Sequence, residues 1–173
     1  MPEPVSIRRL AVLDLVAFKA LRDSMLAAHP EAFTSDAAAE GERAPASYLD
    51  RFGADRADGG HFTLGAWRGE RLVGALGCER DRRVKVRHIG HLIGMMVSAD
   101  ARGSGIGRSL LEVCIRTARD VPGFEMLTLT VTAGNDAAIH LYQSAGFTRY
   151  GSLPRAICVD GRYSAKEHMV LTL

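Results

Sequence analysis

The residues with the clearest chemical potential occupy positions 102–108, where the sequence reads Arg-Gly-Ser-Gly-Ile-Gly-Arg. Three glycines alternate with other residues just before a helical pattern begins. Glycine lets the backbone approach a ligand closely, and the first N–H groups of a helix point outward with the positive end of its dipole. Arg102 and Arg108 flank the turn with positive charge. This composition indicates an anion site, and a diphosphate is the natural ligand for it.

The glycine spacing excludes two common nucleotide-binding motifs. A Walker P-loop needs a lysine directly after its last glycine, and none follows here. The Rossmann fingerprint GxGxxG, counted from Gly103, would need its third glycine where Arg108 stands. The glycines therefore belong to another anion-binding motif or form only a tight turn.

The turn is predicted to join a buried strand to an amphipathic helix. The apolar residues 92–97 precede it, and residues 105–119 follow with a helical stripe. Residues 125–132 then alternate strictly, with Leu127, Leu129 and Val131 on one side, as in a strand. A strand, helix and strand in this order predict a right-handed crossover and a parallel pair.

The remaining elements are predicted from periodicity and turn residues. His29-Pro30 should end the first helix, and the turns at residues 68–71 and Asp160-Gly161 predict hairpins. We expect strands at residues 5–9, 62–67, 72–78, 125–132, 147–159 and 163–173, a strand ending at Val97, and helices at 11–28, 46–52, 105–119 and 136–145. Without a repeat or a low-complexity linker, residues 1–173 are expected to form a single domain.

The composition is that of an ordinary globular protein. Of 173 residues, 47% are apolar and 24% charged, with a net charge of +2, which does not favour nucleic-acid binding. No apolar stretch is long enough for a membrane span, and the first ten residues lack the apolar core of a secretion signal. A cytoplasmic location is expected. Cys78, Cys114 and Cys158 are scattered, as expected for buried free thiols.

A second block, residues 135–147, reads Asn-Asp-Ala-Ala-Ile-His-Leu-Tyr-Gln-Ser-Ala-Gly-Phe. It resembles the N-x-x-A-x-x-L-Y-x-x-x-G-F segment of the GNAT acetyltransferase superfamily. Arg102, Gly105 and Gly107 likewise fill the superfamily's Q/R-x-x-G-x-G/A signature. The resemblance implies an α/β fold, α+β in layer terms. Its central mixed, mostly antiparallel sheet of about seven strands is splayed after the fourth and flanked by about four helices.

The resemblance also implies an acetyl-coenzyme A site. Backbone N–H groups near the glycines would hold the diphosphate, and the sheet, parting beyond Val97, would expose backbone groups to the pantetheine arm. The cofactor-binding residues implied are Met95, Met96, Val97, Arg102, Gly103, Ser104, Gly105, Ile106, Gly107, Arg108, Asn135, Ala138 and Tyr142. Asn135 could contact the cofactor or cap its helix.

Two residues are candidates for proton transfer. Tyr142 matches the residue that often acts as general acid in the superfamily, although its ring could simply pack in the core. In several relatives a carboxylate on the strand before the glycine turn is the general base. His91 stands there instead and could serve, or could be a half-exposed structural histidine. Phe33, Tyr163 and His168 could line an acceptor pocket.

The resemblance implies direct transfer of an acetyl group from acetyl-coenzyme A to a primary amine of a small molecule or peptide. A non-catalytic domain that senses acyl-coenzyme A is the alternative, because no carboxylate is evident near His91. An acyl chain longer than acetyl is a third possibility. We expect no metal, because His88 and His91 would face opposite sides of a strand. A homodimer is possible through an exposed edge of the last hairpin.

Overall fold

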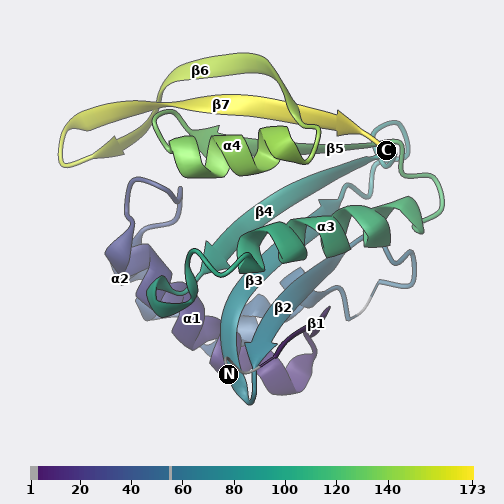
Figure 1. The fold of residues 1–173 in the computed structure, drawn as a ribbon, viewed down its shortest axis with the longest axis horizontal. Helices are drawn as coiled ribbons and strands as arrows, with labels where there is room; N and C mark the ends of the chain where they lie inside the picture. The colour runs from purple at the N-terminus through teal and green to yellow at the C-terminus, as the bar shows by residue number, and fades with distance from the viewer. Residues whose placement is uncertain (1–3, 55) are drawn as a thin grey trace.

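The computed structural model describes residues 4–54 and 56–173, which form one seven-stranded mixed sheet in the order β1-β2-β3-β4-β5-β7-β6 (Figure 1). Among the strand pairs of these residues, only β4 and β5 run parallel, which confirms the predicted parallel pair and fold class. The strands are β1 (Val5–Arg9), β2 (Phe62–Arg68), β3 (Arg71–Arg80), β4 (Ile89–Val97), β5 (Met126–Thr132), β6 (Thr148–Val159) and β7 (Arg162–Thr172). The α-helices are α1 (Leu15–Ala28), α2 (Ala37–Gly41), α3 (Ile106–Arg119) and α4 (Asp136–Ser144).

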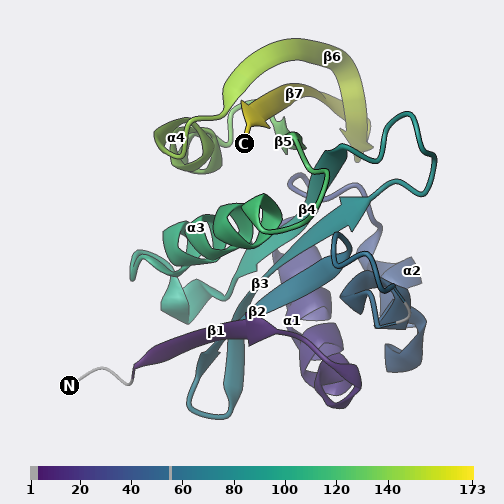
Figure 2. The same cartoon turned by 90° about the vertical axis from the view of Figure 1, so that its right-hand side faces the viewer.

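Helices cover both faces of the first four strands. Figure 2 shows α3 on one side of β2 to β4 and α1 on the other. The stripe of α3 is buried at Leu110, Cys114 and Ala118, against Val73 of β3. On the opposite face, Phe18 of α1 packs edge to face on Tyr48 and Phe52, which lie in the 3-10 segment η2 (Pro45–Phe52). The sheet therefore separates two apolar clusters.

The first helix begins later than its sequence pattern predicts. Residues Val12–Asp14 form a 3-10 turn, and the α-helix starts at Leu15. Leu13, expected on the buried stripe, is 95% exposed because the tighter turn rotates it out of phase with the helix. The helix ends before Pro30, as predicted.

A β-bulge divides β4 into two halves. Ile93 pairs with Gly77 and Met96 with Ala75, so two residues of β4 oppose one of β3. One of the two, Gly94, has a φ of +61°, which glycine adopts without strain. The extra residue reverses which face each later side chain occupies.

The sheet parts between β4 and β5, as expected, but the parting begins earlier. The last pair joining these strands is His91 with Thr128, so the strands separate after His91 and not beyond Val97. The bulge supplies the physical reason, since it bends the second half of β4 away from β5. The two strands diverge visibly in Figure 1.

The chain closes with the predicted hairpin of β6 and β7. Asp160 and Gly161 both have positive φ angles, as their type of two-residue turn requires. Cys158 is exposed, contrary to expectation; it lies on β6, an edge strand of the sheet. Among the helices of residues 4–54 and 56–173, none is long and apolar enough to cross a membrane.

Candidate functional site

A groove of about 660 Å³ runs along the glycine turn. We call it the glycine-turn groove; its lining includes Val97, Arg102, Gly105, Gly107, Ala138 and Leu141. Gly103 and Gly105 have φ angles of +74° and +83°, and Gly105 is the N-cap of α3. Within residues 4–54 and 56–173, the backbone N–H groups of residues 103–108 donate to no acceptor. The turn therefore presents a row of free donors at a helix N-terminus.

The side chains around this turn divide into two groups. Arg102 lines the groove, donating to the Val97 carbonyl oxygen at 3.3 Å and approaching His29 Nε2 at 2.6 Å. Ser104 donates to the Ala101 carbonyl oxygen, and Arg108 is exposed on α3. Neither Ser104 nor Arg108 is among the residues that line the groove.

The second half of β4 forms the wall between the groove and the sheet. Ser98 donates its N–H to Val73, and because backbone groups alternate along a strand, those of Val97 point away from β3 into the gap. Met95 and Val97 line the groove. Met96 does not, because the bulge turns its side chain into the core beneath α1. A ligand arm lying here could meet Met96 only through its backbone.

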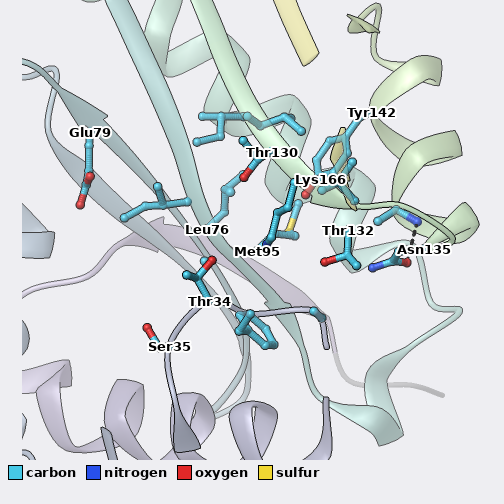
Figure 3. Close-up of a pocket in the computed structure, with 18 of the residues that line it drawn as sticks. Thr34, Ser35, Leu76, Glu79, Met95, Thr130, Thr132, Asn135, Tyr142 and Lys166 are labelled. Atoms are coloured by element: carbon cyan, nitrogen blue, oxygen red, sulfur yellow. Dashed lines mark hydrogen bonds between the residues drawn. The ribbon is translucent and has the colours of Figure 1, made fainter. Parts of the chain in front are cut away.

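A second cavity, of about 340 Å³, continues from the groove into the gap between β4 and β5. We call it the central cavity; Figure 3 shows most of its lining. Six residues line both spaces: Ala32, Phe33, Met95, Thr132, Asn135 and Ala138. The two spaces are therefore continuous, and Phe33 lies where they meet.

Tyr142 lies in the wall of the central cavity, one helical turn after Ala138 on α4. Its ring is 7% exposed and packs edge to face on Phe147. Burial raises the pKa of Tyr142 to about 12, and the charge of the nearby Cys114 thiolate would add to the rise. The phenol is thus protonated at neutral pH. Asn135 caps α4, accepting from the Ala138 N–H at 3.3 Å, and also faces both cavities.

The other candidates from the sequence lie elsewhere. His91 is exposed, pairs through Nδ1 with Thr128 Oγ1 at 2.6 Å, and does not line the central cavity. Tyr163 is exposed beneath Arg155, and the ring of His168 packs against Tyr150. Neither of them lines the cavity.

Sequence reasoning missed four charged residues that line the central cavity: Arg22 of α1, Arg51 of η2, Glu79 of β3 and Lys166 of β7. Glu79 is the cross-strand partner of His91, so the carboxylate sought on β4 is present on the neighbouring strand. A carboxylate ending the apolar run of residues 72–78 was the available signal in the sequence. Arg51 and Lys166 carried none, because only the fold brings their elements to the cavity.

A buried ionic network supports the connection that covers the cavity. Glu40 of α2 accepts from Tyr48 Oη at 2.7 Å, from Arg22 Nε at 2.8 Å and from Arg43 Nη1 at 2.9 Å. Burial alone would raise the pKa of Glu40, but these three hydrogen bonds lower it to about 2. Arg22 also donates to Ser35 at 2.8 Å. The network ties α1, α2 and η2 together beside the cavity.

Replacing Glu40 by glutamine should lower the free energy of unfolding by about 3 kcal/mol, because Arg22, whose side chain is 3% exposed, would lose its compensating charge. The folded-state pKa lies below the usual value of about 4.5, so the wild-type advantage should be complete above that pH and vanish as pH falls toward 2. Urea unfolding of both proteins between pH 7 and pH 3 measures this difference. Equal stability at pH 7 would contradict it.

The parted sheet, the free donors and the adjoining cavity form a site whose shape and donors suit an extended, diphosphate-bearing ligand. The chain belongs to the Acetyltransferase (GNAT) family, whose model matches residues 18–147. A GNAT-family acetyltransferase structure from Streptococcus pneumoniae is 27% identical. The superposition covers 98% of this chain and 100% of the Streptococcus pneumoniae chain, with a TM-score of 0.85.

Two curated relatives carry more specific names. Mycothiol acetyltransferase of Pseudarthrobacter chlorophenolicus is 30% identical over 156 residues, which are 87% of this chain and 44% of that protein. N-alpha-acetyltransferase RimI of Mycobacterium tuberculosis is 38% identical over 99 residues, which are 57% of this chain and 59% of that protein. The chain spans about half the length of the curated relatives it matches.

Proposed function

We propose that this protein transfers an acetyl group from acetyl-coenzyme A to a primary amine by direct transfer. The observation that carries the proposal is the continuity of the two cavities. Together they form one space that runs from the free N–H donors of the glycine turn, past Val97, to Tyr142. The relatives named as acetyltransferases support a catalytic role over the alternative of a non-catalytic sensor.

The residues fit acetyl-coenzyme A in shape and chemistry. Backbone N–H groups of residues 103–108, with Arg102, would hold the diphosphate, and the outward backbone of Val97 would bond the pantetheine arm. Met95 and Ala138 would flank the end of that arm, where both cavities meet. Bound in this way, acetyl-coenzyme A supplies an activated acyl group as a thioester.

Two side chains would transfer protons in this reaction, one as general acid and one as general base. Tyr142 would donate its proton to the departing thiolate, a role that its raised pKa and buried position suit. Glu79 would accept a proton from the acceptor ammonium, directly or through a water molecule. Figure 3 places Glu79 toward the opposite end of the cavity from Tyr142, so the acceptor would lie between acid and base. His91 remains the second candidate for the base.

Replacing Glu79 by glutamine should lower kcat/KM at pH 7 by about 100-fold, because the amine would lose its general base. The loss should shrink as pH rises and the free amine deprotonates unaided. The matched variant His91→Gln should retain near wild-type activity. Thiol release measured from pH 6 to pH 10 compares them, and a large loss confined to His91→Gln would identify that histidine as the base.

The function itself is tested in two stages. Calorimetry at neutral pH should detect acetyl-coenzyme A binding, and no binding would overturn the proposal. Thiol release across a panel of amines should then detect turnover. Tight binding with no release for any amine, including amino acids, polyamines and peptides, would favour the sensor.

Location and assembly belong to the same proposal. We place the protein in the cytoplasm, as a single domain spanning residues 1–173. The outermost strand, β6, carries exposed Tyr150 and Leu153, which supports pairing of two copies through this edge. Light scattering at micromolar concentration would distinguish a dimer from a monomer.

A further inference from the structure

Two cations of the central cavity, Arg51 and Lys166, have no ion-pair partner among the described residues. Arg51 and Lys166 make no ion pair and no side-chain hydrogen bond with any residue of 4–54 and 56–173. Arg22 offers a contrast, because Glu40 and Ser35 satisfy its guanidinium. A desolvated cation is costly unless a partner neutralises it. The cavity therefore contains two positively charged side chains that no carboxylate of the described residues pairs with directly.

Each cation is held in place by the fold. The Arg51 guanidinium lies 5.8 Å from the centre of the Tyr48 ring. Its Nη1 would be 4.0 Å from a Cβ on Gly94, so it reaches the bulge of β4. Lys166 is 9% exposed and pairs with Thr132 across β7 and β5. Burial lowers the pKa of both side chains, as the removal of water from a charged group requires.

Among the described residues of the lining, Glu79 is the one carboxylate, so the net charge of the lining is positive even when Arg22 is counted as neutralised by Glu40. A purely cationic acceptor such as a polyamine would add repulsion from Arg51 and Lys166. An acceptor that carries its own carboxylate would instead supply the missing partner, and a guanidinium can bind that group with two parallel hydrogen bonds. About 340 Å³ is enough room for an amine of amino-acid size.

We propose that the amine acceptor carries a carboxylate, which pairs with one of the two cations of this lining, Arg51 or Lys166, while the amine faces the space between Glu79 and Tyr142. This inference rests on the proposed acetyl transfer and names the substrate class of the same site. It assigns Arg51 and Lys166 to specificity, not to proton transfer.

The test compares each standard L-amino acid with its own carboxamide and its decarboxylated amine, using thiol release with acetyl-coenzyme A. At least one amino acid should exceed its carboxamide in kcat/KM by about 30-fold or more, because the amide leaves the buried cations unpaired. At least one of the variants Arg51→Gln and Lys166→Met should raise KM for that acid while leaving KM for the carboxamide nearly unchanged. Arg116→Gln, which removes an exposed arginine of α3, is the charge-matched control and should change neither value.

Equal or better turnover of the amides and decarboxylated amines by the wild-type protein would overturn the inference. So would Arg51→Gln and Lys166→Met variants that lose acid and amide activity in equal measure, since that pattern marks a general structural role. Calorimetry with acetyl-coenzyme A separates the two levels. Normal coenzyme binding and release with carboxylate-free amines leave the proposed function standing, whereas absent coenzyme binding refutes the function itself.

Discussion

Replacing Tyr142 by phenylalanine is expected to lower turnover by about 100-fold or more while leaving acetyl-coenzyme A affinity nearly intact. The change removes one hydroxyl from the cavity wall and keeps the ring that packs on Phe147. A well-placed general acid contributes roughly 100-fold to 10,000-fold to a rate. Steady-state thiol release and calorimetry on the same preparations measure both quantities.

The pH dependence offers an independent check on this residue. Because burial raises the pKa of Tyr142 to about 12, the acid stays protonated across the neutral and mildly alkaline range. The wild-type rate should therefore show no loss from tyrosine ionisation below about pH 10. Equal turnover in wild type and Tyr142→Phe, or an equal fall in coenzyme affinity, would remove Tyr142 from the role of acid.

Replacing Gly107 by leucine is expected to weaken acetyl-coenzyme A binding by about 100-fold. Gly107 lines the glycine-turn groove, and a Cβ there would lie 3.4 Å from Leu141 Cδ2 and 3.8 Å from Val97 Cγ2. Those are ordinary contacts, so alanine fits. A longer side chain would extend into the passage between the diphosphate cradle and Met95.

Gly107→Ala is the matched control, because it adds the Cβ without filling the groove. It should bind acetyl-coenzyme A within a few-fold of wild type, and thermal unfolding should show both variants folded. Unlike Gly103 and Gly105, Gly107 does not have a positive φ angle. Backbone strain therefore does not complicate the comparison. Wild-type affinity in Gly107→Leu would show that the ligand does not follow this groove.

The elements around the glycine turn were predictable because their patterns are local. The stripe of α3, the alternation of β5 and the Asn135 cap each depend on residues a few positions apart, and the structure has all three. The start of α1 was not predictable from periodicity. The same run of apolar residues can form a 3-10 turn or an α-helical turn, and the two bury different side chains.

The acceptor side of the site could not be predicted in the same way. A single inserted residue at Gly94 decides that Met95 and not Met96 faces the groove, and the sequence does not mark which residue of a strand is unpaired. Glu79 shows the same limit. The search for a base along β4 reached His91, while the carboxylate in the cavity stands on the strand beside it.

By itself, the sequence determined the family resemblance, the order of elements, the anion-binding turn and Tyr142 as the acid to test. These features are encoded within short segments, where spacing along the chain sets position in space. Only the tertiary structure decided that Arg51, Glu79 and Lys166 share one cavity. Their separation in the chain spans most of its length, and they meet because β4 bends away from β5 and leaves a space that η2, β3 and β7 all reach.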